Sequence, residues 1–277
     1  LRARPNDATL HYLRGSVLLD SKRPDAAIES LLLATELNED HTAAADKLIQ
    51  AYLAAGRTQD AVTRLEGQGQ SSPEDYNRAG IAWADQGETA RAIEAFENAL
   101  RIKPDFAVSR RNLARVYARR ASELADAGDS AAAVSALTAA IDNAPEEEGY
   151  GMQLASLYNA SGRAPDAAAV YEAVLERHPR NTRARAELAK TYNNIANTLS
   201  KAGRYEDALL NVEQALLHDP DLPEAHTNRK AMLWNRALTT SETNPGRALE
   251  LYRAYAKMYP EWWQAHSEIG RIYLGQR

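Results

Sequence analysis

The feature that most constrains this chain is a pattern of small, aromatic and turn-forming residues that recurs along its whole length. The clearest copy runs from Pro73 to Phe106. Its spacing predicts two helices joined by a glycine turn, with small residues allowing close approach and two aromatic rings filling the space between. The residues that carry the pattern in this copy are Ala79, Gly80, Trp83, Gly87, Ala92, Phe96, Ala99 and Pro104.

This stretch resembles a tetratricopeptide repeat, which is a pair of antiparallel helices with a period of about 34 residues. The resemblance implies an all-α fold, a right-handed α-solenoid of about seven helix pairs plus a terminal helix, with no sheet. We expect residues 263–277 to form a further first helix that either caps the stack or is cut from a longer array. The predicted repeats, numbered one to seven, are 8–41, 42–72, 73–106, 107–147, 148–181, 182–222 and 223–262.

Two stretches depart from the pattern. Residues 66–72 read EGQGQSS where the second helix of repeat two should continue, and glycine and serine weaken a helix. This predicts either a clipped helix with a surface loop or a hinge between repeats one and two (8–72) and repeats three to seven (73–262). Residues 1–7 resemble the tail of an upstream repeat, so we expect the chain to be a fragment or processed form of a longer protein.

Three repeats are longer than the others, and the excess lies in their first halves. From Trp83 to Gly87 is a step of four residues, whereas Tyr117 to Gly128 is a step of eleven. The excess of seven is about two helical turns, so the apolar face stays nearly in phase. We therefore predict that the first helices of repeats four, six and seven are longer by about two turns.

The composition narrows the function classes. A net charge of −5 argues against a general nucleic-acid role, and the absence of cysteine excludes disulfides and thiolate metal sites. No apolar run approaches the roughly 18 residues of a membrane helix, so we expect no membrane insertion. These properties predict a soluble protein, either cytoplasmic or periplasmic, and the alanine- and arginine-rich repeats resemble bacterial ones.

The sequence contains no motif that indicates catalysis or a cofactor. No phosphate-binding loop or HExxH pattern is present, and no nucleophile, base and acid can be assembled from the spacing. His218 and His226 flank a turn that recurs in other repeats without histidine, so we predict no metal. His11, His226 and His266 share one repeat position and are predicted to fill the core. We predict that the chain is not an enzyme.

The first helices carry the candidate binding residues, because in this family they line the concave surface. Guanidinium groups suit carboxylates, and side-chain amides can both donate to and accept from a peptide backbone. A solvated helix face with ordinary arginine usage is the alternative interpretation. The candidate groove in repeats four to six comprises Arg111, Arg115, Arg119, Arg183, Lys190, Asn193, Asn194 and Asn197.

Two family ligand sets were compared with the sequence. The set that binds chaperone C-termini is not matched, since Gln153 stands where that set has asparagine. Asn112 and Asn228 occupy a position where some relatives carry a ladder of asparagines, but two are too few to form one.

The resemblance implies a non-catalytic scaffold that binds a peptide segment or partner subunit on its concave face. An acidic or extended segment of a protein partner would suit the basic, amide-rich candidate groove. The alternative is an assembly or regulatory segment of a larger polypeptide whose enzymatic domain lies outside this chain.

Overall fold

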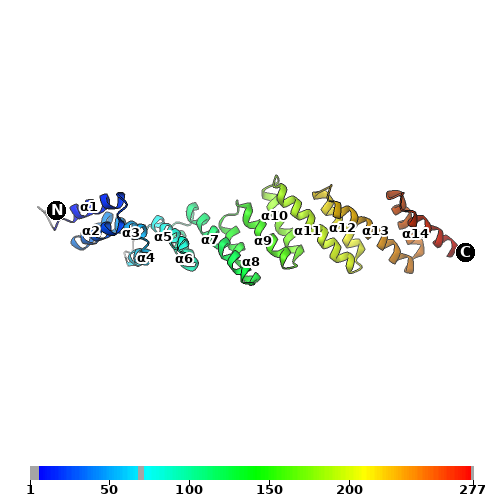
Figure 1. Ribbon diagram of the computed structural model, residues 1–277, viewed down its shortest axis with the longest axis horizontal. Coiled ribbons are helices and arrows are strands. Elements are labelled where there is room, and N and C mark those ends of the chain that lie inside the picture. The colour runs from blue at the N-terminus through cyan, green and yellow to red at the C-terminus, as the bar shows by residue number, and fades with distance from the viewer. Residues whose placement is uncertain (1–5, 68–71, 276–277) are drawn as a thin grey trace. The chain divides into compact units, whose positions relative to one another are not determined.

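The computed structural model describes residues 6–67 and 72–275, and these residues form fifteen α-helices and no strand (Figure 1). The all-α class predicted from the sequence is confirmed. The helices are α1 (Ala8–Asp20), α2 (Pro24–Leu37), α3 (Thr42–Ala54), α4 (Thr58–Gly67), α5 (Pro73–Asp85), α6 (Thr89–Ile102), α7 (Ala107–Asp126), α8 (Ser130–Asn143), α9 (Glu148–Ala160), α10 (Ala164–Arg177), α11 (Thr182–Lys201), α12 (Tyr205–His218), α13 (Pro223–Thr243), α14 (Pro245–Met258) and α15 (Trp263–Gly275).

The chain divides into two compact halves, which are described separately. The N-terminal half is Leu1–Pro145 and the C-terminal half is Glu146–Arg277. In both halves each odd-numbered helix packs against the even-numbered helix that follows it, as first and second helices of one repeat. First helices of successive repeats also touch, at α1–α3, α3–α5, α5–α7 and α11–α13. We call the exposed side of this layer the inner face.

The turns within repeats depend on a left-handed backbone conformation. Five of these turns carry a glycine with φ between 72° and 83°, where a side chain would be strained. Repeat one has Lys22 at this place, with φ of 56°. The glycines are Gly56, Gly87, Gly128, Gly162 and Gly203.

The core of each repeat lies where its second helix crosses its first. Ala92, Phe96 and Ala99 of α6 are fully buried. A Cβ built on Gly80 of α5 would lie 2.6 Å from Cε1 of Phe96, so only glycine permits this approach. Gly15 and Leu31 repeat the arrangement in α1 and α2, with a corresponding distance of 2.5 Å. Burial at these points explains why the small residues recur.

The long first helices expected in repeats four, six and seven are α7, α11 and α13. They have 20, 20 and 21 residues, against 13 in α5 and α9. In α7 the added residues lie between Tyr117 and the turn at Gly128, at the C-terminal end of the helix. Each long helix buries an alanine two turns beyond the position that corresponds to Gly80, namely Ala121, Ala196 and Ala237.

The candidate hinge, residues 66–72, spans the junction between α4 and α5. Helix α4 ends at Gly67 and α5 begins at Pro73, with the Ser72 hydroxyl accepting a hydrogen bond from the backbone nitrogen of Asp75. Residues 68–71 lie outside the described residues, as do residues 1–5 of the proposed upstream tail. The boundary between the compact halves falls instead between Pro145 and Glu146.

The prediction that three histidines fill the core is wrong for two of them. His11 is buried, but His226 and His266 are exposed. The Nε2 atom of His226 lies 2.7 Å from the carbonyl oxygen of Pro220, so this ring folds back onto the start of its own helix. His266 is exposed although α15 packs against α14.

Candidate functional site

The three arginines of α7 lie on the inner face of the N-terminal half, and they are not equivalent. Arg119 donates from Nη1 to the backbone oxygen of Ala84, at 2.9 Å. That oxygen belongs to the last turn of α5, where carbonyl groups have no partner within the helix. Arg119 also lies 3.9 Å from Glu123. Its guanidinium is therefore engaged in holding α5 and α7 together.

Arg111 and Arg115 are free to meet a partner. Both are exposed and lie one helical turn apart. Arg115 makes a long contact of 3.4 Å with Oδ1 of Asn112. Within the described part of the chain, no carboxylate lies within ion-pair distance of either guanidinium. The pair is thus a local excess of positive charge in a chain whose net charge is −5.

A buried polar network lies below these arginines. The Ser109 hydroxyl and the Asn112 side-chain nitrogen each donate to Oδ1 of Asn77, at 3.0 Å in both cases. Asn77 and Ser109 are buried. Because Asn77 lies on α5 and the other two on α7, the network joins successive first helices and fixes the base from which the arginines project.

In the C-terminal half, α11 carries the other five predicted residues. Arg183 and Asn194 are exposed and Asn197 is half-buried. Lys190 donates to Oε1 of Glu187 at 3.0 Å, so its charge is partly neutralised within the helix. Asn194 and Asn197 are available for backbone contacts.

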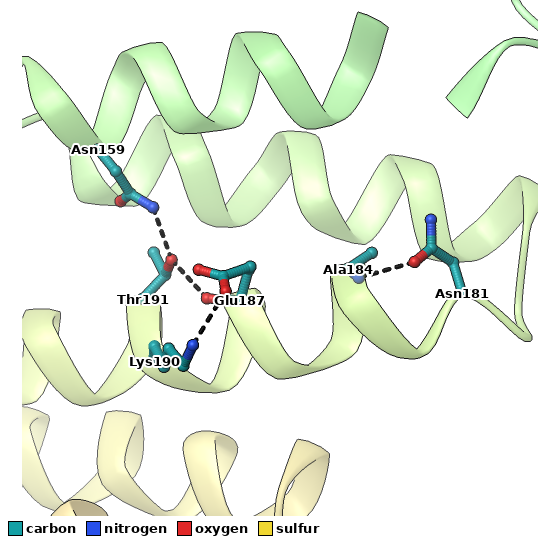
Figure 2. A network of polar contacts seen from close by, with 6 residues as sticks. All are labelled: Asn159, Asn181, Ala184, Glu187, Lys190 and Thr191. Carbon is teal, nitrogen blue, oxygen red and sulfur yellow. Dashed lines mark hydrogen bonds and ion pairs between the residues drawn. The ribbon is translucent and has the colours of Figure 1, made fainter. Parts of the chain in front are cut away.

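Figure 2 shows that this ion pair adjoins a polar contact between α9 and α11. Asn159 of α9 donates from Nδ2 to the hydroxyl of Thr191 at 2.9 Å, and that hydroxyl donates to the backbone oxygen of Glu187 at 2.8 Å. Asn181 caps the start of α11 by accepting from the backbone nitrogen of Ala184 at 2.8 Å. Of these contacts, the bond from Asn159 to Thr191 joins α9 and α11.

Asn193 does not lie at the free surface, contrary to its predicted role in binding. Only 7% of the residue is exposed, and its Oδ1 accepts a hydrogen bond of 2.8 Å from Nδ2 of Asn228. From the sequence, Asn112 and Asn228 are too few to form a ladder of asparagines. Each instead bonds an asparagine of the preceding first helix. The missed signal is a spacing of 35 residues, from Asn77 to Asn112 and from Asn193 to Asn228.

The predicted binding residues thus separate into two groups. Arg111, Arg115, Arg183, Asn194 and Asn197 are accessible, whereas Arg119, Lys190 and Asn193 are engaged within the protein. Three of the eight lie in the N-terminal half and five in the C-terminal half. We treat them as two faces, the α7 face (Arg111 and Arg115) and the α11 face (Arg183, Asn194 and Asn197).

The described residues hold no cluster of three or more histidine, aspartate or glutamate side chains that could bind a metal ion. None of the helices described combines the length and hydropathy needed to cross a membrane.

The fold and its inner faces define a helical repeat protein built from stacked helix pairs. Residues 8–41, 73–106 and 150–216 match family models described as tetratricopeptide repeat. These residues therefore form tetratricopeptide repeats. The first two matches coincide with the limits of repeats one and three predicted from the sequence. Such repeats generally mediate protein–protein interaction, and proteins built from them are typically non-enzymatic.

Solved structures with a similar fold share little sequence with this chain. A MamA protein is 20% identical, with 64% of this chain and 94% of that chain covered and a TM-score of 0.43. A Naa15/Naa10 complex bound to HypK-THB is 16% identical, with 96% of this chain and 39% of that chain covered and a TM-score of 0.46. A TPR2AB-domain:pHSP90 complex of yeast Sti1 is 19% identical, with 96% of this chain and 97% of that chain covered and a TM-score of 0.40. The search of curated protein sequences found no match.

Proposed function

We propose that this protein is a non-catalytic interaction scaffold whose α7 face binds an acidic, extended segment of a protein partner. The observation that carries the proposal is the pair Arg111 and Arg115, both exposed, with no carboxylate of the described residues within ion-pair distance. Two guanidinium groups one turn apart can each hold a carboxylate through paired hydrogen bonds.

The α11 face supplies a second contact of different chemistry. Asn194 and Asn197 can donate to and accept from the backbone of a segment in extended conformation. Arg183, near the start of the same helix, adds one positive charge. We propose, separately from the α7 face, that the α11 face contacts the backbone of an extended segment.

The test compares binding of short labelled peptides by two charge-reversed proteins. The probe is a decapeptide of alternating glutamate and serine, with a lysine and serine decapeptide as its control. The variant Arg111→Glu/Arg115→Glu reverses the charge of the α7 face. The control variant Arg101→Glu/Arg177→Glu makes the same change in net charge at exposed sites on second helices. Arg119 is left intact, because its loss would disturb the contact with α5.

We expect the acidic peptide to bind the wild-type protein and the control variant with similar affinity. Binding by the α7 variant should be at least tenfold weaker. The affinity should also fall as salt is raised, because exposed charges are screened over about 8–10 Å near physiological ionic strength. Equal binding by the two variants would show that net charge, and not the α7 face, attracts the peptide.

A further inference from the structure

The charge of the first helices changes sign across the N-terminal half. Asp46, Asn77 and Arg111 are the fifth residues of α3, α5 and α7, so they occupy equivalent positions of three successive first helices. These helices touch in turn, at α3–α5 and α5–α7, within one compact half. One level of this half therefore runs from an acidic through a neutral to a basic side chain, and its basic end belongs to the α7 face.

Asp46 lacks the hydrogen-bond donors that Asn77 has at the equivalent position. Oδ1 of Asn77 accepts from the third and sixth residues of α7, the next first helix. The third and sixth residues of α5, the first helix that follows Asp46, are Asp75 and Arg78. Arg78 donates to Asp75 at 3.1 Å. Among the described residues, no donor or cation lies within hydrogen-bond or ion-pair distance of the Asp46 carboxylate.

The surroundings of Asp46 favour a positive group from outside the chain. The residue is exposed, so its carboxylate is accessible. Partial burial and, to a lesser extent, the nearby Asp75 carboxylate raise the pKa of the Asp46 carboxyl above its ordinary value. A raised pKa means that the folded protein disfavours the ionised form. A cation at Asp46 would offset the repulsion from Asp75 and supply the contact that the described residues leave open.

We propose that the segment bound at the α7 face also carries a lysine or arginine that pairs with Asp46 on α3. The inference rests on the proposed function and adds a requirement to it, since the segment would be acidic at one end and basic at the other. A purely acidic segment would satisfy Arg111 and Arg115 but leave Asp46 without a partner.

Helix packing sets the spacing between the two charges of the segment. Packed helices lie about 8–10 Å apart, so α3 and α7 are separated by about 16–20 Å across α5. An extended segment advances about 3.3 Å per residue, which makes this separation about five to six residues. Alternate side chains of an extended segment point in opposite directions, so only the even spacing turns both charges toward the protein. We therefore expect the basic residue about six positions from the first acidic one.

The probes are labelled dodecapeptides of serine with glutamate at positions 8 and 10. Position 2 holds lysine, serine or glutamate, and a fourth peptide moves the lysine to position 5, at odd spacing. A set with the reversed sequences allows for the opposite chain direction. The protein variant Asp46→Lys reverses the charge on α3. Glu29→Lys is the matched control, because Glu29 is exposed on the second helix α2 and the change in net charge is the same.

We expect the wild-type protein to bind the peptide with lysine at position 2 about threefold more tightly than the peptide with serine there, the gain of one exposed ion pair. Lysine at position 5 should give no such gain. Asp46→Lys should reverse the order, so that glutamate at position 2 binds more tightly than lysine. Glu29→Lys should keep the wild-type order. Circular dichroism checks that both variants keep their helices.

The outcomes separate this inference from the proposed function. Equal binding of the lysine and serine peptides by the wild type, or an equal shift of the order by Glu29→Lys, overturns the role of Asp46. The proposed function stands in that case if binding of the serine peptide still depends on Arg111 and Arg115. Failure of the serine peptide to bind the wild type contradicts the proposed function, and the inference then falls with it.

Discussion

The side-chain nitrogen of Asn228 donates a hydrogen bond of 2.8 Å to the side-chain oxygen of Asn193, on the preceding first helix. The two residues are 35 positions apart and lie on α13 and α11. This contact assigns Asn193 to the packing of the repeats and leaves its neighbour Asn194 to the surface. Adjacent asparagines in one sequence thus differ in what their loss would do.

Replacing Asn193 by alanine should destabilise the protein, because Asn228 would lose its acceptor in a partly buried place. An unsatisfied group of this kind costs about 1–3 kcal/mol. The matched change Asn194→Ala should alter the free energy of unfolding by less than about 0.5 kcal/mol. Urea denaturation of both variants checks the difference, and equal effects would refute the assignment.

Alanine substitutions at Gly80 and Gly270 should have opposite effects on stability. At Gly80 the new Cβ collides with Phe96, and such overpacking costs about 1–3 kcal/mol. At Gly270 the space is open, so the higher helix propensity of alanine should stabilise the isolated protein by about 0.5–1 kcal/mol. Thermal unfolding of the two variants would contradict this if both melted below the wild type.

Replacing Arg119 by alanine should destabilise the protein more than replacing Arg111 by alanine. Arg119→Ala removes the hydrogen bond to the Ala84 carbonyl, with an expected loss of about 0.5–1.5 kcal/mol. Arg111→Ala, on the same face without such a contact, should change stability by less than about 0.5 kcal/mol. Chemical denaturation of the two variants side by side decides whether Arg119 acts as a structural residue.

Tyr192 should make stability depend on pH in the alkaline range. Burial, together with its hydrogen bond to the Glu172 carboxylate, raises the pKa of the Tyr192 hydroxyl from its ordinary value of 10.0 to about 12. A raised pKa favours the protonated form in the folded state, so the stabilisation is fully present below the ordinary pKa. It is lost as pH rises from the ordinary value through the folded one.

The check is the difference in unfolding free energy between the wild type and Tyr192→Phe, followed across that pH range. The difference should shrink with rising pH, since phenylalanine has no proton to lose. A difference that stays constant would mean that Tyr192 titrates as it does in the unfolded chain.

Repetition is the reason that so much of the fold could be predicted from the sequence. A single Gly80 or Ala92 is a weak signal, but the same spacing in several copies is not. The added length of α7 could be predicted because seven residues return the helix to nearly the same face. The sequence could not predict at which end of α7 the added residues lie, because the position of the extra turns depends on where the preceding repeat packs.

The candidate site was less predictable, because its residues are sorted by contacts that are distant in the sequence. Arg119 meets the end of a helix 35 residues earlier, and Asn193 meets a side chain 35 residues later. The residue type alone does not distinguish Arg119 from Arg115, or Asn193 from Asn194. His11 is buried and His266 is exposed although both occupy the same repeat position, so the spacing alone does not predict their exposure.

The contacts between helices predict where local unfolding begins. Within each half, helices touch mainly those one or two places away in the chain, so every repeat is stabilised by its immediate neighbours. Loss of α15 would remove support from α14 but leave α11 and α12 packed as before. Local opening should therefore begin at end helices such as α15. Amide hydrogen exchange would record it as a gradient of protection along each half rather than as one common rate.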